Sequence, residues 1–272
     1  MRKLGLLILC ASASACLGDP DAPTTSDGGF VSVPDQATSC QSNNNGVFER
    51  SELPLVIGAS ARYLQNPDGT LATVDPVGQD SPDGTAWDFT STAGAPVDLP
   101  ISALAGTWYE HEFPGATYAT YTDLPSKTLG IFRLTSSALE LMGYASEAPN
   151  QTLLIYDLPV ALVRFPLKQG DGWVTTGHIV NGTFNHLPVA ETDTYKISVD
   201  AKGVVVLPFL RVNNTLRVRV ELDQALPGGT VTHTIQLLYF RECVGEVGRM
   251  VSKAGETSAN FTSAAIFRRL AL

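Results

Sequence analysis

The feature that most constrains the fold of this chain is a series of short segments in which apolar and polar residues alternate. Residues 216–223 alternate without a break, and so do residues 194–200. A period of two places alternate side chains on opposite faces of a strand, whereas a helix repeats every 3.6 residues. Turn signals separate such segments, for example Asn-Pro-Asp-Gly at 66–69 and Pro-Gly-Gly at 227–229. The pattern predicts an all-β fold, mainly antiparallel, built as a curved sheet, half-barrel or sandwich.

The alternation also predicts that these strands have one buried face and one face in water. Four charged residues of the clearest strand fall in one stripe that is expected to face water: Arg217, Arg219, Glu221 and Asp223. Only residues 102–112 have a helical character, and Gly106 and Pro114 interrupt it. We therefore expect at most one or two short helices.

The N-terminus indicates export. Arg2 and Lys3 precede an apolar run at 4–15, which has the length of a signal-peptide core and is too short to span a ~30 Å hydrocarbon layer as a helix. The run ends in Ala-Ser-Ala directly before Cys16, which resembles the bacterial lipobox, although Ala13 stands where leucine is usual. We expect a signal peptide at 1–15 and a diacylglycerol and fatty-acyl (palmitate-type) anchor on Cys16. The alternative is ordinary cleavage at the same place, which would release a free secreted protein.

The segment after the lipobox predicts the domain organisation. Residues 16–39 are rich in Pro, Gly, Ser and Asp, and such a segment buries too little apolar surface to fold. We expect a flexible tether there, followed by a single β-rich domain at 40–272. Residues 75–124 are weakly patterned and are expected to form a second lobe or an elaborated loop region. Leu17 replaces the aspartate that often signals inner-membrane retention, which favours the outer membrane, on its periplasmic or surface face.

Charge narrows the range of partners. The net charge is −9, and removal of Arg2 and Lys3 with the signal peptide would make it −11. An acidic surface argues against binding to nucleic acid and against electrostatic docking on anionic lipid. Attachment to the membrane is therefore expected through the lipid.

The cysteines predict one disulfide. Cys10 leaves with the signal peptide and Cys16 carries the lipid, so Cys40 and Cys243 are left in an oxidising compartment. A bond between them would close a loop of roughly 200 residues, worth about 5 kcal/mol on the chain-entropy model. The alternative is two buried thiols that are not joined.

Two segments resemble a known group of proteins. Residues 165–173 read Phe-Pro-Leu-Lys-Gln-Gly-Asp-Gly-Trp and residues 239–248 read Tyr-Phe-Arg-Glu-Cys-Val-Gly-Glu-Val-Gly. They resemble the FPLxxGxxW motif and the closing turn of a group of bacterial envelope lipoproteins, over residues 153–252. The resemblance implies a strongly curved antiparallel sheet, related to the half-barrels of lipoprotein carriers, and implies no activity. Cys243 falls inside the second segment, which fits a structural role for that turn.

Residues 41–52 resemble an EF-hand calcium loop, with Gly46 as its turn glycine. The expected oxygen ligands are Gln41, Asn43, Asn45, the carbonyl of Val47, Glu49 and Glu52. Gln41 replaces the usual aspartate and Pro54 stops the exiting helix, so binding would be weak, with a dissociation constant of ~10⁻⁴–10⁻³ M. The alternative is an Asn-Gly turn beside the disulfide.

The sequence contains no recognisable catalytic constellation. Its histidines lack metal-binding spacing, and no nucleophile elbow is present. Glu110 and Glu112 lie beside aromatic residues, as in some sugar-binding sites, but an exposed turn anchored by these aromatic residues explains them better. We expect a non-catalytic envelope lipoprotein that binds an apolar ligand or a protein partner on a concave sheet face. The alternatives are a calcium-stabilised surface adhesion module and a carbohydrate-active enzyme.

Overall fold

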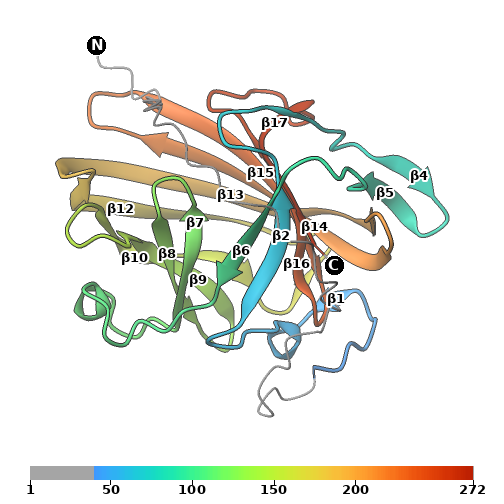
Figure 1. Cartoon of the computed structure of the whole chain (residues 1–272), viewed down its shortest axis with the longest axis horizontal. Coiled ribbons are helices and arrows are strands. Elements are labelled where there is room, and N and C mark those ends of the chain that lie inside the picture. Colours follow the sequence, from blue (N-terminus) through green and yellow to red (C-terminus); the bar gives the residue numbers. More distant parts are fainter. Residues whose placement is uncertain (1–39, 272) are drawn as a thin grey trace, which may run out of the picture. The chain divides into compact units, whose positions relative to one another are not determined.

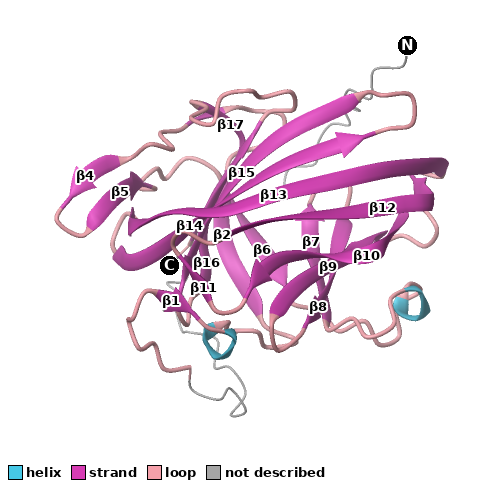
Figure 2. Ribbon diagram, turned by 180° about the vertical axis from the view of Figure 1, so that it is seen from behind, coloured by secondary structure: helices cyan, strands magenta, loops and turns pink. Residues whose placement is uncertain are grey.

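The computed structural model describes residues 40–271. The predicted signal peptide, the lipidation of Cys16 and the tether up to residue 39 lie outside the described residues. Within them, the helical elements are two short 3-10 turns, η1 (Arg50–Glu52) and η2 (Glu110–Glu112), and strands make up the rest of the regular structure (Figure 2). The all-β prediction with at most two short helices is confirmed. No helix of this part is long and apolar enough to cross a membrane.

Most strands belong to one antiparallel path that curves into a nearly closed barrel (Figure 1). Their spatial order is β6 (Ala95–Pro100), β2 (Ser60–Gln65), β17 (Ser263–Leu270), β16 (Gly245–Ser252), β15 (Val231–Arg241), β14 (Arg211–Ala225), β13 (Leu187–Val206), β12 (Gly172–Phe184), β10 (Leu153–Arg164), β9 (Ala138–Ser146), β8 (Thr128–Leu134) and β7 (Tyr118–Asp123). The two edges approach each other at a bridge between Ser102 and Ala119, whose backbones exchange two 2.9 Å hydrogen bonds.

Five short strands lie outside this path. β3 (Ala72–Thr73) pairs with β17 in antiparallel orientation. β4 (Gln79–Ser81) pairs antiparallel with β5 (Gly84–Asp88), and β5 in turn pairs with β13 in parallel orientation. A separate small sheet joins β1 (Val47–Phe48) to β11 (Leu167–Lys168).

Cross-strand register decides which side chains face the barrel interior, because directly paired residues point to the same side. Ile197 on β13 pairs with Val220 on β14 and with Trp173 on β12. Ile197 and Val220 pack into one buried cluster with Leu141 of β9 and Leu154 of β10. This cluster is the main core, and it fills much of the barrel interior.

Parts of the outer surface are covered by chain segments. Trp87 and Phe89, in and after β5, pack edge-on against Tyr239 of β15, with ring centroids 5.0 Å apart. Tyr109 and Phe113 belong to another buried cluster, which they form with side chains of β7, β8 and β9. The weakly patterned residues 75–124 therefore supply both covers and the two edge strands.

The prediction that Arg217 and Arg219 face water is wrong. Both side chains are about nine-tenths buried, and both donate to Asp200, Arg217 through Nε and Nη2 and Arg219 through Nε. The carbonyl oxygens of Pro76 and Ala259 accept further hydrogen bonds from them. The residues lie on the outer face as expected, but segments distant in sequence cover that face.

The predicted disulfide is confirmed. Cys40 and Cys243 are bonded, and Cys243 occupies the tight turn between β15 and β16 with a φ of +60°. Close to this bond, Phe48 packs against Phe165 and Phe240, with centroids 6.1 and 5.8 Å apart. The two segments that resemble the lipoprotein group therefore meet around the first residues of the domain.

Candidate functional site

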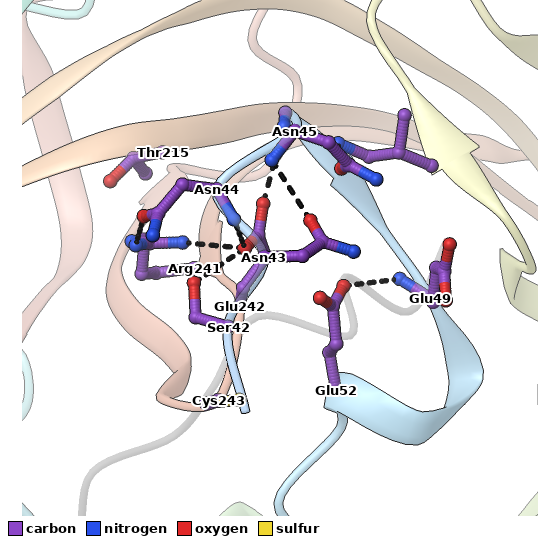
Figure 3. A network of polar contacts seen from close by, with 12 residues as sticks. Ser42, Asn43, Asn44, Asn45, Glu49, Glu52, Thr215, Arg241, Glu242 and Cys243 are labelled. Atoms are coloured by element: carbon purple, nitrogen blue, oxygen red, sulfur yellow. Dashed lines mark hydrogen bonds and ion pairs between the residues drawn. The ribbon is translucent and has the colours of Figure 1, made fainter. Parts of the chain in front are cut away.

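The EF-hand-like loop folds around a carboxylate that the sequence analysis did not identify, that of Glu242 (Figure 3). One of its oxygens accepts hydrogen bonds from the Ser42 hydroxyl at 2.5 Å and from the Asn44 backbone at 2.7 Å. The other accepts from the Gly46 backbone at 3.2 Å. Burial opposes ionisation of Glu242, but these hydrogen bonds hold its pKa below the ordinary value. The loop therefore presents donors to an anion at its centre.

The predicted calcium ligands make local hydrogen bonds. Asn43 Oδ1 accepts from the backbone of Asn45 at 2.9 Å, and Asn45 Oδ1 accepts from the backbone of Val47 at 2.7 Å. One oxygen of Glu52 accepts from the Glu49 backbone at 2.9 Å. Its other oxygen is buried and has no hydrogen-bond partner within the described residues. Gln41 is exposed. Calcium binding by this loop stays a prediction, and Glu52 is the side chain that best supports it.

A second polar cluster lies inside the barrel, on a wall formed by β9, β10 and β13. Tyr156 donates to Oδ2 of Asp193, and its hydroxyl lies 3.0 Å from that of Tyr195. The Tyr195 hydroxyl lies 3.2 Å from that of Tyr144. Each hydroxyl has one proton. Since Tyr156 uses its proton on Asp193, Tyr195 donates to Tyr156 and Tyr144 donates to Tyr195. The result is one directed chain of hydrogen bonds that ends on a carboxylate.

Local sequence makes room for this chain. Gly177 on β12 pairs with Asp193 on β13 and faces the same side. A Cβ added to Gly177 would lie 2.5 Å from the ring of Tyr156, well inside contact distance. A residue without a side chain therefore lets the Tyr156 ring lie against the β12 backbone.

The carboxylates of this wall resist ionisation. Glu191 faces the same side, two residues before Asp193 on β13. Burial, reinforced by the charge of Asp193, raises the pKa of Glu191 to about 7. Burial also raises the pKa of Asp193, although hydrogen bonds from Tyr156 and Gln224 oppose the shift. Burial raises the pKa of Tyr144 to about 12, so its hydroxyl stays a donor at neutral pH.

Arginines form a second interior wall on β16 and β17. Arg249 pairs with Leu238 and with Arg268, and Arg268 pairs with Gln65 of β2, so these side chains face the interior. Glu246 accepts hydrogen bonds from both arginines. Burial lowers the pKa of Arg249, but Glu246, with smaller effects of Tyr63 and Tyr144, raises it above the ordinary value. Glu246 is the carboxylate that pairs with both arginines.

Three buried polar atoms on these walls have no hydrogen-bond partner within the described residues. They are Oε1 of Gln65, Oδ1 of Asp193 and Nε of Arg268. Asp193 is fully buried and the other two residues are 6% exposed. A buried polar group without a partner costs roughly 1–3 kcal/mol. Their presence on the two interior walls marks the barrel interior as the candidate site.

Other candidates are weaker. Glu110 and Glu112 lie in η2, part of the segment that covers the outer face of β7–β9, and Glu110 accepts a hydrogen bond from the Gly106 backbone. A surface pocket of about 620 Å³ lies outside the barrel and includes Asp75 and Asp88. Both carboxylates already accept hydrogen bonds from their own loops. Within residues 40–271, no group of three His, Cys, Asp or Glu residues is arranged to hold a metal ion.

Comparison of the chain with protein-family models, curated proteins and solved structures found no match. The interior residues were not singled out from the sequence. The interior cluster draws on three strands, and the only local signal was a tyrosine, an aspartate and a glutamate at alternate positions, 195, 193 and 191.

Glu191 is expected to make the protein less stable as pH rises. Its pKa in the folded state, about 7, exceeds the ordinary value of 4.5, so between these values the folded state binds more protons than the unfolded state. Stability is then lost as pH rises from about 5 to about 8, by about 2 kcal/mol after allowance for partial exposure. Glu191→Gln should remove this loss, as measured by urea unfolding in phosphate buffer. Glu112→Gln, in the η2 turn, is the control, and equal pH profiles for wild type and Glu191→Gln would contradict the assignment.

Proposed function

We propose that the protein is a non-catalytic binding protein of the bacterial envelope, tethered by a lipid on Cys16, and that its ligand lies inside the barrel. The observation that carries the proposal is the set of buried polar atoms without partners on Gln65, Asp193 and Arg268. Buried polar atoms of this kind form their hydrogen bonds with water or with a bound molecule. Ligand sites typically present a few such polar atoms for contact with the ligand.

The polar character of these groups refines the expected ligand. The apolar side chains of the interior, such as Ile197, Leu216 and Val218, are almost completely buried against one another. The interior groups with unused bonding capacity are polar. A small polar ligand therefore fits the interior better than the purely apolar one expected from the sequence.

The anchor and the location in the outer membrane rest on the sequence of the first 39 residues. A tethered binding domain needs a ligand site that faces away from the membrane or inside the fold, and an interior site meets that need in any orientation. A protein partner stays the alternative, and so does an adhesion role that depends on calcium.

A matched pair of variants on β12 tests the interior site. Thr175 pairs with Tyr195 and faces the interior, whereas its neighbour Val174 is exposed on the outer face. In protein isolated from the envelope of the producing cell, the native mass should exceed the denatured mass by that of a bound molecule. Thr175→Trp should abolish this difference and Val174→Trp should keep it, provided that circular dichroism shows both variants folded. Identical native and denatured masses in the wild type would count against the proposal.

A further inference from the structure

The tyrosine–carboxylate wall brings two carboxyl groups, those of Asp193 and Glu191, to the barrel interior. Asp193 is fully buried and Glu191 is half-buried, yet neither forms a salt bridge to a described residue. The groups that act on the pKa of either carboxyl within residues 40–271 are Tyr156, Gln224 and the other carboxylate of the pair, and all of these are neutral or negative. Uncompensated carboxylates in a buried position are rare, because desolvation makes them costly unless a cation or a proton joins them.

The wall also offers the chemical groups that bind an ammonium group: a free carboxylate oxygen and tyrosine side chains. Asp193 Oδ2 receives the proton of Tyr156, so Oδ1 is left as a buried acceptor with no donor among the described residues. The hydroxyls of Tyr156, Tyr195 and Tyr144 are linked to this carboxyl group in one chain, and the rings of Tyr144 and Tyr156 meet edge to face with centroids 6.1 Å apart. Aromatic faces together with carboxylates are the usual surroundings of a bound organic cation.

We propose that the ligand carries a protonated amine, which donates to Oδ1 of Asp193 and to the carboxylate of Glu191 between the tyrosine rings. The inference rests on the proposed interior site and names the class of molecule that fills it. Glu191, the more accessible of the two carboxylates, makes the outer contact and Asp193 the inner one. An amine fits the donor set better than a metal ion, because no third His, Cys, Asp or Glu of the described residues joins the pair.

The test uses the purified full chain and two probes of equal length, 1,4-diaminobutane and the uncharged 1,4-butanediol. Calorimetric titration in phosphate buffer at neutral pH should show saturable binding of the diamine and none of the diol. Glu191→Gln keeps the shape of the side chain and should weaken diamine binding at least about tenfold, which corresponds to about 1.4 kcal/mol. Asp193→Asn should weaken it further. Glu112→Gln, on the outer covering segment, should leave the affinity unchanged.

Asp193 is buried, so Asp193→Asn can lower binding simply by destabilising the fold. The test therefore depends on Glu191→Gln, and urea unfolding checks that this variant is folded. Equal binding of diamine and diol, or a diamine affinity that Glu191→Gln leaves unchanged, would overturn the amine assignment. If native mass spectrometry finds a bound molecule that is lost in Thr175→Trp while the diamine fails to bind, the interior site stands and only the amine is wrong. If the diamine does not bind and the wild type carries no bound molecule, both proposals fall.

Discussion

Asp200→Ala is expected to lower the free energy of unfolding by about 4 kcal/mol, because it leaves two buried guanidinium groups without their shared carboxylate. Asp200 accepts from Arg217 at 2.7 and 3.0 Å and from Arg219 at 2.7 Å. The Arg217 guanidinium also lies 5.3 Å from the ring centroid of Trp87, which shields one of its faces from water. Urea unfolding followed by tryptophan fluorescence measures the change.

A second ion pair on the same outer face provides the control. Lys196 and Glu221 form a 3.0 Å contact, with the lysine side chain 65% exposed. Because exposed pairs contribute at most about 1 kcal/mol, Glu221→Ala should cost much less than Asp200→Ala. Equal losses for the two variants would show that the cover over Arg217 and Arg219 opens in solution.

Removal of the disulfide with the double variant Cys40→Ser and Cys243→Ser is expected to cost about 5 kcal/mol. The two cysteines are 203 residues apart in sequence, so the bond restricts most of the unfolded chain. The bond also holds the start of the domain beside Glu242, which organises the loop at 42–46. The midpoint of urea unfolding should fall accordingly.

Chemical reduction distinguishes the effect of losing the disulfide from the effect of the two serine substitutions. Wild-type protein in a reducing agent should unfold at the same urea concentration as the double variant, and the reductant should not change the double variant. A thiol reagent should count two more free thiols per chain after reduction than before it, which verifies the reduction. A wild-type midpoint that reduction leaves unchanged would contradict a stabilising role.

The sequence by itself determined the strands and the disulfide. Alternation is a local property, since each residue of 216–223 takes its face from its position in an extended backbone, and β14 (Arg211–Ala225) spans this segment. The Cys40–Cys243 pairing followed by elimination, once the roles expected for Cys10 and Cys16 were set aside. Both inferences needed no knowledge of which strands are neighbours.

Tertiary structure decided what surrounds each charged group. Periodicity assigned Arg217 and Arg219 to the correct face, but the cover that buries them comes from residues as distant as Pro76 and Ala259. The EF-hand-like loop had the spacing of a cation site, yet its centre holds Glu242, about 200 residues away in sequence. Tyr144, Tyr156 and Asp193 come together only because the sheet curves and brings β9, β10 and β13 to one wall. Alternation determines on which face of its own strand a side chain lies. Burial, charge balance and ligand contacts depend on the register and closure of the whole barrel.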